Sequence, residues 1–242
     1  MALPWIGLAL AFVAAAANIV GGWVVARQPW HPLYLRYFVA LASGFMLAAA
    51  MLEMLPESYE LIGGQAAGWV LGGYLLIHFF EHTLSGHFHF GEEVHAEEVA
   101  DTGRIRTVLL GLMIHSFVDG VSIASGFLVS DFLGWVVFLA VFLHKMPEGF
   151  AVSSVMVASG RSPRQAIVAA SLLGGSTIAG VLIMAPLSAQ VPYTLPLSAG
   201  MTVYVAASDL IPEVNREPGL RLALTVFVGV LFMLVLKWLF AV

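Results

Sequence analysis

The sequence predicts an all-α integral membrane protein with eight membrane-spanning helices. The 242 residues are 60% hydrophobic and only 10% charged, and the mean hydropathy is +0.93. A soluble domain carries about 25% charged residues, so an ordinary globular protein is excluded. Long apolar runs follow one another along the whole chain. Cysteine is absent, which excludes disulfides, thiolate metal sites and cysteine nucleophiles.

Each predicted helix is an apolar run of roughly the 20 residues that cross a bilayer. The N-terminus lacks the basic segment of a signal peptide, so we interpret the first run as a retained helix, although Ala14–Ala17 resembles a cleavage site. The third run is the least apolar because His78, Glu81 and His82 lie near its end. The predicted helices are residues 4–26, 37–55, 66–84, 107–129, 132–158, 166–189, 194–212 and 220–242.

Arginines in the connections indicate the orientation. They occur at the first, third, fifth and seventh connections and not at the others. Positively charged loops are usually cytoplasmic. We therefore expect a multi-pass protein of the cell membrane (inner or plasma) with both termini extracytoplasmic. The arginines are Arg27, Arg36, Arg104, Arg106, Arg161, Arg164, Arg216 and Arg221.

The one long connection, residues 85–106, is predicted to be a cytoplasmic loop rich in histidine and glutamate. Such tracts can hold metal ions loosely, and the alternative is a solvated acidic loop. The candidate ligands are His82, His87, His89 and His95. We predict a single transmembrane domain, residues 1–242, that carries this loop.

A short similarity links the ends of the second and seventh helices. The second helix ends with Glu53-Met-Leu-Pro-Glu57, and the seventh ends with Asp209-Leu-Ile-Pro-Glu213. The two helices run in opposite directions. We therefore predict an inverted repeat that relates helices 1–3 to helices 6–8 around helices 4 and 5, an architecture of secondary transporters.

Two motifs place a histidine and a carboxylate on one helix face. His115 and Asp119 are four residues apart in the fourth helix, as are His144 and Glu148 in the fifth. Both pairs lie near the helix midpoints, so they share one depth. A charged group there costs about 2.5–3.5 kcal/mol on insertion scales and needs compensation. Imidazole and carboxylate suit zinc and related divalent ions, so these four residues are the predicted metal ligands.

A buried ion-pair network that includes Lys145 is the alternative interpretation of this cluster. An interhelical hydrogen bond contributes only about 0.6 kcal/mol on average, which compensates poorly for so many ionisable groups. Pro147 favours the metal site, because it removes the hydrogen bond to the carbonyl of Leu143 beside the ligands. A freed carbonyl at membrane depth is tolerated where it lines a cavity.

These motifs resemble those of the ZIP (Zrt/Irt-like) family of divalent-metal transporters. The family patterns are His-Asn-x-x-acid-Gly in helix four and His/Gln-x-x-Pro-Glu-Gly in helix five; this chain has His115-Ser-Phe-Val-Asp119-Gly and His144-Lys-Met-Pro-Glu148-Gly. The resemblance covers essentially the whole chain, including the histidine-bearing loop and the Leu-Pro-Glu end of helix two. It implies a homodimer, external termini, and import by alternating access.

The chain departs from the family at a second, adjacent metal position. Many members form it with the helix-four Asn, an acid after the helix-five histidine, and an acid in helix six. Here Ser116 and Lys145 occupy the first two positions, and helix six has no acid. We expect a mononuclear site, with the Lys145 ammonium in place of the second cation. The alternative is a lysine that snorkels or pairs structurally.

The expected function is therefore a secondary transporter that imports zinc or a related divalent cation. Cadmium, iron, manganese and cobalt are not separated by these ligands. Glu53, Asp209 and Glu213 are candidate pathway residues, or solvated helix ends. The metal is cargo and not a cofactor, and the partners are the lipid bilayer and a second copy, not nucleic acid. Alternatives are a divalent-cation exporter, and an intramembrane zinc hydrolase, although the His-Glu-x-x-His signature of such enzymes is missing.

Overall fold

A computed structural model describes residues 5–27, 32–85, 102–216 and 219–240, and these are all-helical apart from short turns. Seven helices in this part of the chain are long and apolar enough to cross a membrane, which makes this a multi-pass membrane protein. The predicted third span is also helical, as α4 followed by a π-helical segment, but it is not one of the seven. The main helices are α1 (Trp5–Arg27), α2 (Pro32–Ala49), α4 (Gln65–Phe80), α6 (Thr102–Val129), α7 (Asp131–Ala158), α8 (Pro163–Met184), α9 (Val191–Tyr204) and α11 (Leu220–Phe240).

The second helix is longer than the predicted 37–55. From α2 the chain continues through a π-helical segment, η1 (Ala50–Met54), into α3 (Leu55–Ile62). It then turns at Gly63, whose φ of +59° is a conformation that favours glycine. The end of the apolar run therefore does not mark the end of the helix, because the last turns, which contain Glu57 and Glu60, are also helical.

The seventh helix is likewise longer than the predicted 194–212. From α9 it continues through the π-helical segment η4 (Val205–Leu210) into α10 (Ile211–Asn215). The sixth helix begins at Pro163, earlier than predicted, because Ser162 and Gln165 form a reciprocal capping box.

The predicted loop 85–106 is helical at both of its ends. The π-helical segment η2 (Glu81–Ser85) extends α4, and α6 already begins at Thr102. The intervening residues, which include His87, His89 and His95, lie outside the described part of the chain.

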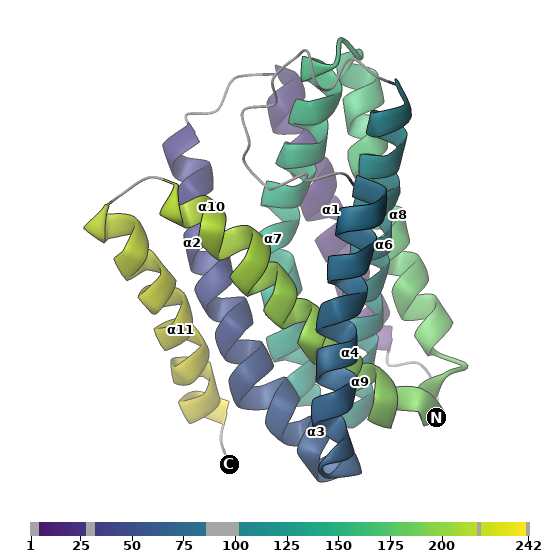
Figure 1. Cartoon of the computed structure of the whole chain (residues 1–242), viewed down its shortest axis with the longest axis vertical. Coiled ribbons are helices and arrows are strands. Elements are labelled where there is room, and N and C mark those ends of the chain that lie inside the picture. Colours follow the sequence, from purple (N-terminus) through teal and green to yellow (C-terminus); the bar gives the residue numbers. More distant parts are fainter. Residues whose placement is uncertain (1–4, 28–31, 86–101, 217–218, 241–242) are drawn as a thin grey trace.

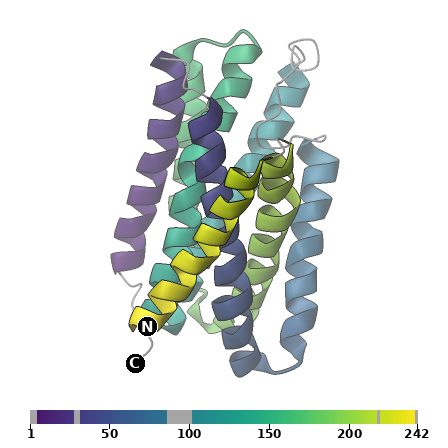
Figure 2. The same ribbon diagram turned by 90° about the vertical axis from the view of Figure 1, so that its left-hand side faces the viewer.

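The helices divide into two groups of four. In the first group α1 packs against α7 and α8, and α6 packs against α7 and α8; in the second α2 packs against α11, and α4 against α9. The groups meet where α2 lies against α7 and α6 against α9. Figures 1 and 2 show all these helices lying side by side in one bundle.

Four helix pairs, two in each group, cross at reciprocal glycines. A Cβ built on any of these glycines would lie 1.8–2.2 Å from a carbonyl oxygen of the partner helix. That carbonyl always belongs to the residue three positions before the partner's own glycine. The backbones are therefore in direct contact, as in small-residue crossings of membrane helices. The pairs are Gly21 with Gly149 (α1–α7), Gly120 with Gly180 (α6–α8), Gly44 with Gly229 (α2–α11) and Gly73 with Gly200 (α4–α9).

Candidate metal centre

The two motifs lie on antiparallel neighbours, α6 and α7, each 28 residues long. A single residue, Ser130, connects these helices, and its Oγ accepts a hydrogen bond from the N–H of Leu133. Because the helices have equal length and this short connection, His115 near the middle of α6 and His144 near the middle of α7 come to the same level. The predicted match in depth is thus a direct result of local structure.

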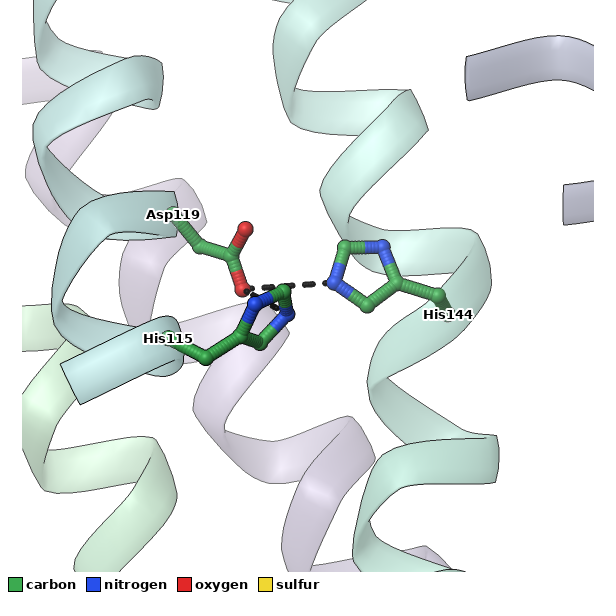
Figure 3. A group of neighbouring side chains, drawn as sticks. All are labelled: His115, Asp119 and His144. Carbon is green, nitrogen blue, oxygen red and sulfur yellow. Dashed lines mark hydrogen bonds and ion pairs between the residues drawn. The ribbon is translucent and has the colours of Figure 1, made fainter. Parts of the chain in front are cut away.

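Three of the predicted ligands converge. Figure 3 shows His115, Asp119 and His144 pointing toward one another. The Nε2 atoms of His115 and His144 lie 3.4 and 3.2 Å from Asp119 Oδ2. One ligand atom from each residue fits within 4.8 Å of the others, and all three residues are at most 7% exposed.

The two imidazoles differ in their hydrogen bonds. His144 Nδ1 donates a hydrogen bond to the carbonyl of Ala140 at 2.9 Å, and its Nε2 lies 3.2 Å from Asp119 Oδ2. Such a contact is the usual way in which a protein fixes the tautomer of a metal-binding histidine. His115 Nε2 is buried and has no hydrogen-bond partner among the described residues. This unsatisfied nitrogen fits a cation better than it fits a closed polar network.

Glu148 lies beside this group but is not part of it. Its Oε1 accepts a hydrogen bond from Ser116 Oγ, and its Oε2 lies 2.5 Å from Lys145 Nζ. The same ammonium is 2.6 Å from Asp119 Oδ2 and donates to Ser116 Oγ at 2.9 Å. Ser116, Lys145 and Glu148 are fully buried. The ammonium therefore bridges the two carboxylates on which the predicted site depends.

At one end of the second helix group, Glu53 is paired. Its Oε1 lies 2.7 Å from Nζ of Lys237, at the end of α11. Lys237 also donates to the carbonyl of Leu52 at 3.1 Å. Pro56 has no N–H to bond that carbonyl, so the lysine occupies a position that the proline leaves open. Glu53 and Lys237 thus form an ion pair that joins the second helix to α11.

Near the opposite end, Asp209 is only 3% exposed and faces another acid. The carboxyl group of Glu81 lies near enough to interact electrostatically with the carboxyl group of Asp209 and the hydroxyl group of Tyr204. His82 donates from Nδ1 to the carbonyl of His78 at 3.0 Å, and the two ring centroids lie 4.0 Å apart with the rings tilted by 40°. Asp209 therefore belongs to a polar cluster at the ends of α4 and α9.

Glu213, one turn beyond Asp209, is 8% exposed and pairs with Arg216 at 3.3 Å.

Two further polar residues, the half-buried Glu81 and the buried Asn18, had no predicted role. Glu81 was noted only as a weakness of the third span, although an acid inside a membrane helix is itself a functional signal. Asn18 interrupts the first apolar run, is fully buried, and neither amide atom has a hydrogen-bond partner in the described part of the chain. Its main-chain oxygen contacts Gly149, next to Glu148.

A helical bundle of this kind, with two histidines and a carboxylate converging inside it, defines a multi-pass membrane protein with a buried group of side chains that could hold a metal ion. The chain belongs to the ZIP zinc transporter family, whose sequence profile matches residues 2–107 and 104–237. The family resemblance expected from the two motifs is thereby confirmed. Members of this family are transporters and not enzymes, which agrees with the expected non-enzymatic role.

Individual relatives are also named as zinc transporters. The chain is 37% identical over 112 residues to a zinc transporter, zipt-7.1, of Caenorhabditis briggsae, an alignment that covers 43% of this chain and 29% of the relative. It is 22% identical over 285 residues to a ZIP13 homolog of Drosophila melanogaster, covering 88% and 80%. With ZIP13 of Pongo abelii the identity is 26% over 208 residues, covering 78% and 60%. The match thus spans less than a third of the nematode protein but most of the fly protein.

Proposed function

We propose that this protein is a secondary transporter that imports zinc, or a related divalent cation, into the cytoplasm by alternating access. The convergence of His115, Asp119 and His144 in the middle of two antiparallel membrane helices carries the proposal. Two imidazoles and a carboxylate are a common zinc donor set. The relatives named as zinc transporters support zinc as the cargo; cadmium, iron, manganese and cobalt remain within the chemistry of these ligands.

The proposed site is mononuclear, with Glu148 as the fourth ligand. In the metal-free protein the Lys145 ammonium neutralises Asp119 and Glu148. An arriving cation takes over Asp119 and Glu148, and the ammonium keeps its contact with Ser116 at the position of the second metal. Such a site contains one exchangeable cation and one fixed cation. The fixed charge limits the repulsion between two buried acids when the cargo has left.

Acids at either end of the second helix group mark the proposed path. Glu53 would receive the cation outside after releasing Lys237. Asp209, with Glu81 beside it, and Glu213 would receive it inside. The histidines of the 85–106 segment are the proposed last ligands before the cytoplasm. A path of successive partial sites allows release without one deep trap, as in other ion pathways.

Two features support the proposed inverted repeat, which would exchange α1 with α8, α2 with α9, α4 with α11, and α6 with α7. The first is the set of glycine crossings: the exchange converts the α1–α7 crossing into α8–α6, and α2–α11 into α9–α4. The second is a π-helical segment at each of the two similar sequences, η1 with Glu53 and η4 with Asp209, each followed by a helix that begins near a proline.

The same arrangement supports eight spans in a single transmembrane domain. The first turn of α1 and the last turn of α11 lie at the same end of the bundle (Figures 1 and 2), as an even number of crossings requires. The arginine-bearing connections then lie at the other end, which we assign to the cytoplasm. We further propose a homodimer, as the family resemblance implies, and a movement of one four-helix group against the other.

Metal uptake by the purified full-length protein in sealed proteoliposomes tests this function. We expect zinc to enter the vesicles, and His115→Ala or His144→Ala to reduce the initial rate at least about tenfold, because each removes a ligand whose replacement typically costs at least that much affinity. Gln65→Ala, an exposed position at the start of α4 outside the cluster and the proposed path, serves as the control. Equal rates for all variants would remove the cluster from the pathway. The direction of transport is tested in metal-loaded vesicles that contain the protein in both orientations. Blocking the protein molecules of one orientation from outside then separates import from export.

The number of bound cations tests the mononuclear site. Calorimetric titration of the purified protein with zinc and with cadmium should give one high-affinity ion per chain that is lost in His144→Ala. In Lys145→Asp, where an acid replaces the fixed cation, we expect a second ion to bind. Two tight ions per chain in the unmodified protein, both lost with His144, would contradict the mononuclear site.

A further inference from the structure

A basic pocket lies at the arginine-bearing end of the first helix group and shares no residue with the metal-ligand cluster. It is a cavity of about 380 Å³ between α6, α7 and α8. Three arginines and an apolar wall line it. We propose that this pocket binds one anionic phospholipid, with the phosphate held by the arginines and an acyl chain along the wall. This proposal goes beyond metal transport and does not depend on which ion is carried.

The charges in the pocket fit a phosphate. Arg106 comes from α6, Arg161 from the turn after α7, and Arg164 from the first turn of α8, so the three guanidinium groups come from separate segments. No carboxylate lines the pocket within the described residues. Arginine binds phosphate through two parallel N–H donors, which gives geometric specificity as well as attraction. Basic pockets between membrane helices on the cytoplasmic side are typical binding places for anionic headgroups.

The apolar wall gives the pocket the shape of a lipid site and not of a soluble-anion site. Arg164, Val168 and Leu172 are spaced by four residues, so they share one face of α8. From Arg164 to Leu172 the helix rises about 12 Å toward the middle of the membrane. Val168 and Leu172 are 52% and 44% exposed, so this face is open to the bilayer. On α6, Leu109 continues from Arg106 in the same direction.

Arginines at this end would also anchor helices in any membrane, whatever its lipids. The two interpretations make different predictions, because anchoring requires no particular lipid and no particular arginine. Arg216 and Arg221 provide the comparison. They lie at the same end of the molecule, beside the second helix group, and do not line the pocket.

Native mass spectrometry of the purified full-length protein tests the proposal. The protein in detergent is titrated separately with dioleoyl phosphatidylglycerol, dioleoyl phosphatidylcholine and glycerol 3-phosphate. We expect one phosphatidylglycerol per chain, little phosphatidylcholine, and little glycerol 3-phosphate. Each basic residue near an anionic lipid surface contributes about fivefold in affinity. Arg106→Gln/Arg164→Gln should therefore weaken phosphatidylglycerol binding about 25-fold, whereas Arg216→Gln/Arg221→Gln, with the same change in charge, should leave it unchanged.

A variant of the wall separates the lipid from a free phosphate ester. Leu172→Gln should weaken the binding of phosphatidylglycerol and leave that of glycerol 3-phosphate unaffected. Equal retention of the two phospholipids, or equal losses in the two arginine double variants, would overturn the proposal. So would binding of glycerol 3-phosphate as tight as that of phosphatidylglycerol, because the wall would then contribute nothing. All of the replaced side chains are exposed, so these variants should retain the fold.

Discussion

Lys145→Met is expected to destabilise the metal-free protein by about 3–5 kcal/mol, the usual cost of removing one partner from a buried ion pair. The ammonium is completely buried and lies 2.6 Å from Asp119 and 2.5 Å from Glu148. Methionine matches its length but leaves two neighbouring carboxylates without their cation. The thermal unfolding midpoint of the purified protein, measured in detergent with a chelator, reports this loss.

The other lysine of the chain supplies the matched control. Lys237 also contacts a carboxylate, at 2.7 Å, but its side chain is 45% exposed. An ion pair at that exposure contributes about 0–1 kcal/mol, so Lys237→Met should shift the midpoint little. Adding zinc should raise the midpoint of Lys145→Met more than that of the unmodified protein, because a metal ion can replace the missing charge. If Lys145→Met and Lys237→Met had the same unfolding midpoint in the presence of the chelator, Lys145 would have no role as the fixed cation.

A double variant separates the charge from the shape of the lysine. Glu148→Gln removes one of the two acids that Lys145 neutralises, so Lys145→Met/Glu148→Gln should be more stable than Lys145→Met alone. With the Glu148→Gln single variant, these measurements complete a double-mutant cycle, whose coupling energy is commonly about 0.5–3 kcal/mol for directly contacting groups.

The sequence was sufficient to predict the parts of the site that local structure determines. The four-residue spacing puts His115 beside Asp119, and the length of the apolar runs puts His144 at the same depth. The position of Lys145 was only partly predictable. Its three-residue spacing from Glu148 on one helix accounts for that contact, but its approach to Asp119 depends on how α6 packs on α7. The separation of Glu148 from the three converging ligands follows from this packing.

Features built from helices far apart in the sequence were less predictable. Glu81 and Asp209 meet only because α4 packs against α9, and no local pattern announces such a contact. The similar sequences around Glu53 and Asp209 were visible, but the π-helical segments that they form were not. Apolar periodicity says little about a helix end that carries several acids, which explains why the ends of the second and seventh helices were misplaced.

Gly73→Ala is expected to destabilise the protein by about 3 kcal/mol, the upper end of the usual cost of overpacking. A Cβ at this position would lie 2.0 Å from the carbonyl oxygen of Leu197. That obstacle is backbone, which cannot rotate away as a side chain can, so α4 and α9 must separate. The thermal unfolding midpoint again measures the effect. Gly200→Ala disturbs the same crossing from the other helix, so the double variant should lose much less than the sum of the two single variants.

The adjacent glycine makes this a stringent test of the reciprocal crossings. A Cβ on Gly72 would meet no atom within 4 Å, so Gly72→Ala changes only the intrinsic helix propensity, which favours alanine by up to about 1 kcal/mol. Gly72→Ala should therefore be neutral or stabilising, one residue away from a severe loss. By the proposed repeat, Gly229→Ala in the α2–α11 crossing should resemble Gly73→Ala, because the exchange of halves makes these positions equivalent. If Gly73→Ala and Gly72→Ala had the same thermal unfolding midpoint, the helices would not be in backbone contact. The glycine crossings would then no longer support the inverted repeat.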